Sequence, residues 1–426
     1  MSVANEMVIK TEGFTLHIVK TNKYKTNTLV WKMKAPLNAE TVTLRALLLN
    51  VLQSSTKKYP TTTALRTYLD DLYGAGFFVD LAKKGEQHIM SFSIDIANEK
   101  FLKDSTPLLQ KGIDFLAEVL LNPNIENESF HQETVEKEKR ILKQRIQSIY
   151  DDKMRYSNVR LVEEMCKGEP YALDANGIAS KVEEITPQNL FDYYKKAIRE
   201  DELHLYIIGD VNENEVEKFC RNLQFENRTP IQLERKEGSN VKEVKEIKEK
   251  QDVKQGKLNI GYRTNVRFGD QDYFALQVFN GIFGGFSHSK LFINVREKAS
   301  LAYYAASRLE SHKGLLMVMS GIEAKNYDQA TTIIREQMDA MKKGDFTDQE
   351  IEQTKAVINN QLLETTDTSR GLVEILYHNV IANQNFTVDD WIQGINKISK
   401  QDIIEVAKKI ELDTIYFLTG LEGNGE

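Results

Sequence analysis

Histidine is the residue type in this sequence that is best suited to bind a metal ion or to transfer a proton near neutral pH. The chain has seven: His17, His88, His131, His204, His288, His312 and His378. No two are four residues apart, the spacing that places two ligands on one face of a helix, and none lies beside a cysteine. The spacing of these residues therefore indicates no metal-binding pair.

Nucleophile and phosphate-binding motifs are also missing. The sequence has neither the Gly-x-Ser-x-Gly turn that exposes a nucleophilic serine nor a phosphate-binding P-loop. Its only two cysteines, Cys166 and Cys220, lie far apart in sequence. Two cysteines in 426 residues exclude a disulfide framework and favour a reducing compartment.

The charge balance excludes two further function classes. Lys and Arg total 56 and Asp and Glu total 63, so the formal net charge is -7. This balance disfavours generic binding to nucleic acid or to an anionic membrane surface. No apolar run approaches the roughly 18 residues of a spanning helix, and the first ten residues lack the pattern of a signal peptide. We therefore expect a cytoplasmic protein that binds neither nucleic acid nor membrane.

The elements that must position any functional residues occur in blocks. In the first half, strand patterns occupy 15–20, 27–34, 77–82, 88–96 and 203–208. Helical patterns occupy 40–52, 61–73, 101–121, 126–149, 155–166 and 186–199. Helices grouped between pairs of strands indicate an α+β fold with a largely antiparallel sheet.

The second half repeats this order. Strands are expected at 258–262, 301–307 and 314–321, and helices at 270–283, 289–297, 327–343 and 347–366. The last helix begins with a capping box formed by Thr347 and Glu350. Both halves close with a similar strand, Leu205-Tyr-Ile-Ile-Gly209 and Ile415-Tyr-Phe-Leu-Thr-Gly420. We therefore predict two duplicated domains, 1–226 and 258–426, joined by a charged linker, 227–257, that runs into an edge strand.

Three stretches of the chain resemble the pitrilysin/insulinase superfamily of zinc metallopeptidases, which includes the mitochondrial processing peptidase. The first is Ala46-Leu-Leu-Leu-Asn50, where that family has a helix bearing His-x-x-Glu-His. The second is the predicted helix around Arg145, where the family has its third zinc ligand, a glutamate. The third, Arg296-Glu-Lys-Ala-Ser-Leu-Ala-Tyr303, follows a Gly-Gly turn as in the signature of the family's second domain. The resemblance covers nearly the whole chain and implies the family's duplicated fold.

The zinc ligands of that family do not survive in this sequence. Their positions fall on Ala46, Asn50 and Arg145, and the general base falls on Leu49. Zinc needs neutral nitrogen or carboxylate donors, whereas a guanidinium repels a cation and Leu cannot move a proton. Glu138 matches a family acidic position on the helix of Arg145, but alone it is expected to be solvated or ion-paired at the surface. We expect no metal and no catalytic residue in this chain alone.

The second-domain signature is intact and implies a different role. In the family, its Arg and Tyr contact substrate, and here they correspond to Arg296 and Tyr303. A guanidinium can donate to substrate carbonyls or carboxylates, and a phenol can stabilise an oxyanion. An exposed helix Arg and a core strand Tyr would be the structural alternative, and Tyr304 competes with Tyr303 because neighbouring strand residues face opposite sides. The Gly284-Gly285 pair is expected to serve backbone geometry.

Some bacterial members of the family work as pairs of homologous subunits, one with the zinc site and one with the Arg/Tyr signature. This sequence resembles the zinc-less subunit of the Bacillus-type cytoplasmic pair. The resemblance implies a non-catalytic, substrate-holding subunit whose partner is a zinc-bearing homologue and whose substrate is an unfolded or small peptide. Two alternatives remain at this point: a purely structural scaffold, and a self-sufficient peptidase with a site built from residues such as His17 or His288.

Overall fold

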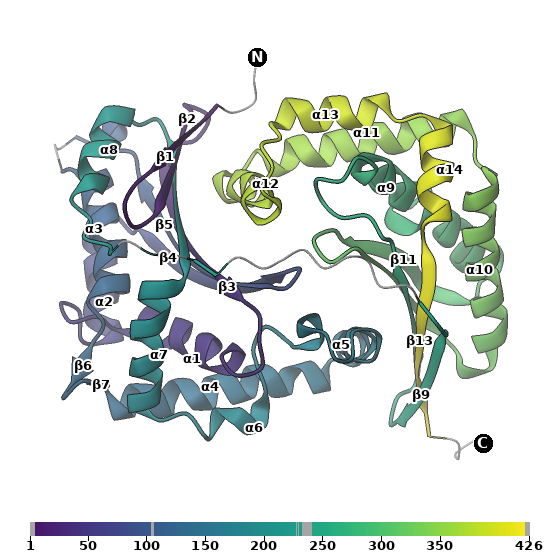
Figure 1. The fold of residues 1–426 in the computed structure, drawn as a ribbon, viewed down its shortest axis with the longest axis horizontal. Coiled ribbons are helices and arrows are strands. Elements are labelled where there is room, and N and C mark those ends of the chain that lie inside the picture. The colour runs from purple at the N-terminus through teal and green to yellow at the C-terminus, as the bar shows by residue number, and fades with distance from the viewer. Residues whose placement is uncertain (1–4, 104–105, 227, 229, 232–240, 422–426) are drawn as a thin grey trace. The chain divides into compact units, whose positions relative to one another are not determined.

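The computed structural model describes residues 5–103, 106–226, 228, 230–231 and 241–421 (Figure 1). The chain forms two compact units that exchange segments. Unit 1 comprises Met1–Gln147, Leu173–Glu234 and Thr366–Ile375, and unit 2 comprises Ser148–Ala172, Arg235–Thr365 and Leu376–Glu426. The two-domain organisation agrees with the prediction, but residues 148–172 and 366–375 each belong to the unit formed mainly by the other half of the chain.

Unit 1 contains a six-stranded sheet in the order β1-β2-β8-β3-β5-β4. Its strands are β1 (Glu6–Lys10), β2 (Thr15–Lys20), β3 (Thr26–Pro36), β4 (Gly76–Lys84), β5 (Gln87–Ala97) and β8 (Glu202–Gly209). Only the β2–β8 pair is parallel, and the other neighbours are antiparallel. The mainly antiparallel sheet confirms the predicted α+β class.

Helices cover one face of this sheet. They are α1 (Val42–Ser54), α2 (Thr62–Asp71), α3 (Leu108–Leu121), α4 (Gln132–Asp151), α6 (Ala179–Val182), α7 (Pro187–Glu200) and α8 (Glu213–Arg221). The core includes Trp31, Leu47, Phe92, Phe115 and Leu205, all at most 1% exposed. Each such side chain contributes about 1.5–3 kcal/mol of burial free energy. A short hairpin, β6 (Ile125–Glu126) and β7 (Ser129–Phe130), precedes α4.

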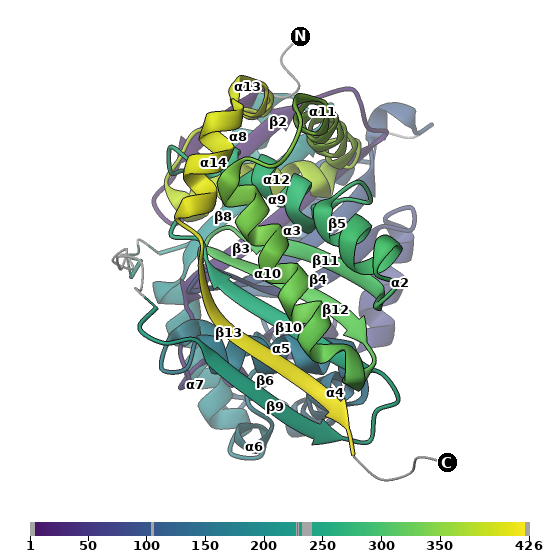
Figure 2. The same ribbon diagram turned by 90° about the vertical axis from the view of Figure 1, so that its right-hand side faces the viewer.

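Unit 2 contains a five-stranded sheet in the order β11-β12-β10-β13-β9. Its strands are β9 (Lys245–Gln251), β10 (Gly256–Arg263), β11 (Ala302–Glu310), β12 (Leu315–Ile322) and β13 (Glu411–Gly420). Figure 2 shows β9, β13, β10 and β12 side by side beneath α10 (Tyr327–Lys343). The edge strand expected after the charged linker is β9, which pairs in parallel with β13; linker residues 227, 229 and 232–240 lie outside the described residues.

The helices of unit 2 lie on both faces of its sheet (Figure 1). One face is covered by α5 (Lys153–Met165), whose Leu161 and Met165 pack with Met317 and Leu418 of the sheet. This packing, rather than sequence proximity, assigns residues 148–172 to unit 2. The remaining helices are α9 (Tyr273–Asn280), α11 (Asp348–Thr365), α12 (Ser369–Ala382), α13 (Val388–Lys397) and α14 (Lys400–Lys408), with α12 shared between the units.

Local capping chemistry sets several helix starts. The predicted capping box before α11 is present: the Glu350 backbone N–H donates to Thr347 Oγ1 at 3.2 Å, and the Thr347 N–H donates to Glu350 Oε2 at 2.7 Å. Two predicted helices begin later than expected, α3 at Leu108 after Pro107 and α4 at Gln132 after the β6–β7 turn. Proline restricts the residue before it, which explains the late start of α3.

The helix expected over 270–283 begins at Tyr273 and changes from α-helical to π-helical geometry at Gly281, where α9 runs into a π-helical turn, Gly281–Gly285. A second π-helical segment covers Phe292–Lys298. π-Helical turns are rare in proteins, and those that occur often lie at functional sites. Among the described residues, no helix is both long and apolar enough to cross a membrane.

Candidate functional site

Helix α1 carries Ala46, Leu49 and Asn50, the residues predicted to replace two zinc ligands and the general base, whereas the third predicted ligand position, Arg145, lies on α4. The leucines and valines of α1 repeat at helical spacing, so this helix is buried almost all round. Ala46 and Leu49 are 1% exposed and Asn50 is 3% exposed. The Asn50 side-chain amide donates to the Ala46 carbonyl oxygen at 3.0 Å. The three positions are therefore occupied by packing and by a local hydrogen bond.

Arg45 anchors α1 in this buried position. Its Nη1 donates to Asp201 Oδ2 at 2.6 Å and to the hydroxyl of Tyr193 at 3.1 Å, while Nη2 donates to the Met33 carbonyl oxygen at 3.0 Å. Arg45 is fully buried and Asp201 is 4% exposed. Removing one partner of such a pair leaves an uncompensated buried charge. The helix that would hold zinc in an active relative is thus held by a structural ion pair.

Glu138 and Arg145, the two positions of α4 where the family has acidic residues, differ in burial. Arg145 is exposed on α4. Glu138, expected to be a surface residue, is instead buried, with 6% of its area exposed, and its Oε1 lies 3.3 Å from Lys137 Nζ. The prediction that Glu138 is solvated is therefore wrong, because this face of α4 turns inward, whereas the predicted ion pair is present. Within the described residues, no group of three or more His, Cys, Asp and Glu side chains could hold a metal ion.

Two pairs of histidines form contacts that sequence spacing does not reveal. His17 Nε2 lies 2.9 Å from His204 Nδ1, and His312 Nε2 lies 2.6 Å from His378 Nδ1. The members of these pairs are 187 and 66 residues apart in sequence. Sequence spacing misses both pairs, because the first joins neighbouring strands and the second joins the β11–β12 turn to α12, and only the fold brings these segments together.

The His17–His204 pair belongs to a chain of four groups on one face of the unit 1 sheet. His17 Nδ1 contacts Glu6 Oε1 at 2.7 Å, and His204 Nε2 contacts Glu202 Oε1 at 2.7 Å. Burial lowers the pKa of His204 below its usual value in spite of Glu202. Burial opposes ionisation of Glu202, but the hydrogen bond from His204 and the charge of Lys34 outweigh it and lower the pKa of Glu202 to about 2. The chain is a buried structural network, with both ring nitrogens of His17 engaged.

The other histidine considered as part of a self-sufficient site is His288. Its Nε2 lies 2.9 Å from Thr354 Oγ1, and burial lowers its pKa. A single imidazole beside a hydroxyl lacks the second and third donors of a zinc site.

Arg296 and Tyr303 lie together in unit 2. The guanidinium carbon of Arg296 is 4.5 Å from the centroid of the Phe292 ring and 5.9 Å from that of the Tyr303 ring. Tyr303 is 78% exposed, the largest value among the exposed hydrophobic side chains of the described chain, and Arg296 is exposed as well. The signature thus presents a guanidinium and a phenol side by side to solvent.

The backbone that positions this pair is irregular throughout. Arg296 lies in the π-helical segment Phe292–Lys298, and Ser300 has a φ of 51°. The pairing of β11 with β12 shifts register between Ala302 and Ala305, so Tyr303 lies in a bulge of an edge strand. Such strained and irregular positions cluster at functional sites. An ordinary helix followed by a regular strand would place both side chains differently.

Side-chain contacts fix the irregular segment. Asn294 Nδ2 donates to the Lys290 carbonyl oxygen and to Gln337 Oε1 of α10, both at 2.9 Å. A Cβ added to Gly284 would lie 2.8 Å from the Ser307 backbone nitrogen, so only glycine allows this approach to β11. The geometric role expected for Gly284 is confirmed.

The competition between the two neighbouring tyrosines is decided by burial. Tyr304 packs against Gly321 of the neighbouring strand β12. Burial, with a smaller contribution from the Asp152 charge, raises the pKa of Tyr304 to about 12. Of the two phenols, only Tyr303 is well exposed to a ligand.

Comparison with known proteins provides an independent line of evidence. A family model described as "Peptidase M16 inactive domain" matches residues 184–358. A Bacillus subtilis (strain 168) protein named "Probable inactive metalloprotease YmfF" is 56% identical over 424 residues, covering 99% of this chain and 100% of that protein. The "Uncharacterized zinc protease YmxG" of the same organism is 22% identical over 316 residues, covering 70% of this chain and 72% of that protein.

Solved structures share the fold over its full length. A conserved protein from Enterococcus faecalis V583 is 37% identical, with a TM-score of 0.92 over 99% of this chain and 100% of that one. A peptidase M16 inactive domain from Pseudomonas fluorescens is 17% identical, with a TM-score of 0.81 over 99% of this chain and 100% of that one.

Proposed function

This chain belongs to the peptidase M16 family, as an inactive member that resembles its zinc proteases, and from that premise we propose that it is the non-catalytic, substrate-holding subunit of a two-subunit zinc peptidase. The proposed partner is a homologous chain that keeps the zinc ligands. The proposed substrates are unfolded or small peptides, and the proposed compartment is the cytoplasm.

The observation that carries the proposal is the exposed pairing of Arg296 with Tyr303. A guanidinium 5.9 Å from a phenol ring that is 78% exposed is poorly explained by core packing. In the same chain, the positions of the zinc ligands and general base on α1 are buried and hold no metal donor set. A purely structural role does not explain why the Arg/Tyr pair is kept and exposed while the metal ligands are absent. A subunit that binds substrate but leaves hydrolysis to its partner explains both features.

The chemistry of the two side chains suits peptide binding. Arg296 has several N–H donors that can reach a backbone carbonyl or a terminal carboxylate. The Tyr303 hydroxyl can donate to an oxygen that gains negative charge as the peptide bond is attacked. An extended peptide can also pair with the edge strand of a sheet. The candidate edge strands are β4 in unit 1, at the opposite edge from β1, and β11 in unit 2, at the opposite edge from β9.

The test is reconstitution of peptidase activity. The purified chain, a zinc-bearing homologue from the same genome and an equimolar mixture are each incubated with a library of quenched fluorescent peptides. We expect no hydrolysis by this chain alone and hydrolysis by the mixture well above that of the homologue alone. Native mass spectrometry of the same samples should show a complex with one copy of each chain.

Two results would overturn the proposal. If the homologue has the same activity with and without this chain although the two form a complex, the chain is a scaffold. If this chain hydrolyses peptides alone after chelation and dialysis, it contains a catalytic site of its own.

A further inference from the structure

The two sheets share one topology except at a single edge. Unit 1 contains the order β2-β8-β3-β5-β4, and unit 2 contains the equivalent order β9-β13-β10-β12-β11. In each, the first pair is parallel and the following pairs are antiparallel. Unit 1 then adds β1, which pairs antiparallel with β2 and has no counterpart among the described residues of unit 2.

The two corresponding edges differ in how they are protected against pairing with another chain. The outer strand of unit 2, β9, has the sequence KEIKEKQ, and closely spaced charges discourage edge-to-edge association. The outer strand of unit 1, β1, has the sequence EMVIK, with Met7 41% and Val8 51% exposed. It has no proline, no bulge and no central charge. An apolar edge of this kind is a template for strand addition.

The hydrogen-bonding groups of β1 that face outward follow from the hairpin geometry. The Thr11 N–H donates to the Phe14 carbonyl oxygen at 3.0 Å, closing the turn between β1 and β2. Because backbone groups of an antiparallel strand alternate between its two sides, Met7 and Ile9 also pair with β2. The N–H and C=O groups of Glu6, Val8 and Lys10 therefore point away from the sheet.

The sequence of β1 is complementary to itself. In an antiparallel pairing centred on Val8, Glu6 of one copy lies opposite Lys10 of the other, and Met7 lies opposite Ile9. Opposite charges and apolar pairs in these positions are favourable. The outward groups of Glu6, Val8 and Lys10 would supply about six intermolecular backbone hydrogen bonds. The Glu6 carboxylate is held by His17 at 2.7 Å, which keeps this end of the strand in place.

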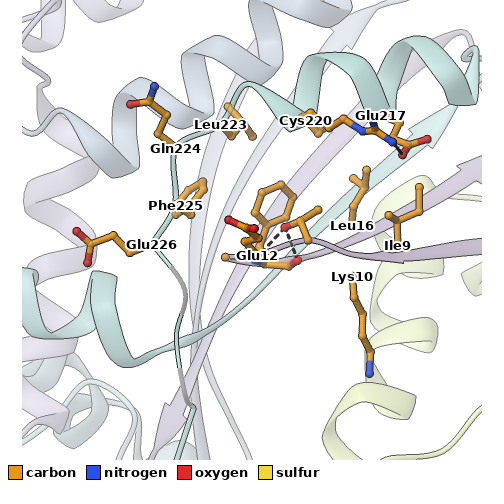
Figure 3. Close-up of a pocket in the computed structure, with 14 residues that line it drawn as sticks. Ile9, Lys10, Glu12, Leu16, Glu217, Cys220, Leu223, Gln224, Phe225 and Glu226 are labelled. Carbon is orange, nitrogen blue, oxygen red and sulfur yellow. Dashed lines mark hydrogen bonds and ion pairs between the residues drawn. The ribbon is translucent and has the colours of Figure 1, made fainter.

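A pocket with a mixed polar and apolar lining lies at the end of β1 (Figure 3). It has a volume of about 590 Å³ and lies between the β1–β2 turn, the end of α8 and the segment that follows α8. Its lining includes Ile9, Leu16 and Phe225. Side chains directly opposite in an antiparallel pair lie on the same face. The Met7 side chain of a second copy would therefore lie beside Ile9 at this pocket.

We propose that two copies of this chain associate through their β1 strands, in antiparallel register centred on Val8, to form one continuous sheet with Met7 of each copy against Ile9 and the pocket of the other. The contact is isologous, so it closes as a dimer. A five-residue strand is a small interface, so the dimer is weak and is populated at concentrations on the order of 100 µM. This inference is independent of the proposed peptidase role, because it uses neither Arg296 nor Tyr303.

Sedimentation velocity on the chain alone, over about 1–300 µM, tests the association. We expect a concentration-dependent shift from monomer to dimer. Val8→Lys places two like charges opposite each other and should weaken dimerisation at least about tenfold. Val8→Pro removes an outward N–H that the dimer would use, so it should weaken dimerisation to a similar extent. The monomer should still fold, because edge strands tolerate proline where the N–H faces solvent. Thermal melts of both variants report whether the monomer remains folded.

Cross-linking tests the register even if one of these variants fails to fold. Val8→Cys should cross-link through a short bis-maleimide more efficiently than the matched variant Lys248→Cys on β9, since both native cysteines are buried. A chain that stays monomeric at 300 µM overturns the proposal. So does a dimer that Val8→Lys and Val8→Pro leave intact, or a Val8→Cys variant that cross-links no better than Lys248→Cys. If Val8→Lys disrupts only the complex with a zinc-bearing homologue, this edge binds that chain and the proposed homodimer is wrong.

Discussion

His17 and His204 face each other across neighbouring parallel strands, with 2.9 Å between Nε2 of the first ring and Nδ1 of the second. Both rings are buried, and a carboxylate binds the outer nitrogen of each, Glu6 on one side and Glu202 on the other. The four groups are joined in a row by these contacts, so each group depends on its neighbours. The network ties the edge strand β1 to the centre of the unit 1 sheet.

We predict strong coupling between these two rings. His17→Phe and His204→Phe should each lower the free energy of unfolding of unit 1 by about 1–3 kcal/mol, because each leaves buried polar atoms unsatisfied. The double variant should lose less than the sum, by about 0.5–3 kcal/mol. Urea denaturation in a Trp391→Phe background measures this, since Trp31 then reports on unit 1 alone. His131→Phe, at a half-exposed position, is the control, and strict additivity would show that the network has no energetic coupling.

A second prediction concerns the pH dependence of unit 1. Burial, followed by the charge of Arg45, lowers the pKa of His88 to about 3. Below about pH 6.5 the unfolded chain binds a proton at this residue that the folded chain does not, so stability falls as the pH decreases towards 3. The slope from this single group is about 1.4 kcal/mol per pH unit. The variant His88→Leu should lack this part of the slope between pH 6 and 4, measured by urea midpoints, and an unchanged slope would contradict the burial argument.

Metal content provides the third prediction. The purified chain should contain well below one zinc per molecule by elemental analysis, because Ala46, Asn50 and Arg145 replace the three ligands. Reintroducing the family's metal-site residues into α1 should destabilise the fold rather than restore a zinc site. Leu49→Glu should destabilise the chain by at least about 3 kcal/mol, because it buries an unpaired carboxylate at a position that is 1% exposed. One zinc per wild-type chain, removable by a chelator, would contradict the buried-helix explanation.

The fourth prediction compares the effect on peptidase activity of substituting Arg296 or Tyr303 with the effect of substituting a nearby exposed arginine. In the reconstituted pair, Arg296→Ala and Tyr303→Phe should each lower kcat by about 10²–10³-fold, the usual effect of losing one transition-state donor. A role in uniform substrate binding would raise KM and leave kcat unchanged. Arg308→Ala, an exposed arginine farther along β11, is the matched control and should change little. Equal effects of all three substitutions would mean that the site assignment is wrong.

Much of the fold was predictable because its signals are local. The apolar spacing in α1, the Thr347–Glu350 capping box and the similar closing strands of the two halves depend on residues a few positions apart. The loss of the zinc ligands is also readable position by position. The signature from Arg296 to Tyr303 is a short continuous motif, so the two residues proposed to bind substrate can be selected without coordinates.

Tertiary structure decided what depends on distant residues. The pairing of His17 with His204 spans 187 residues, and α5 joins unit 2 because its apolar face packs on β10 and β13 rather than on the strands that precede it. Glu138 is buried because of the orientation of α4, which helical periodicity alone left open. The exposure of β1 depends on the strand order of the complete sheet. Local sequence specifies which elements form and which residue types they carry, whereas long-range packing determines which side chains meet and which face solvent.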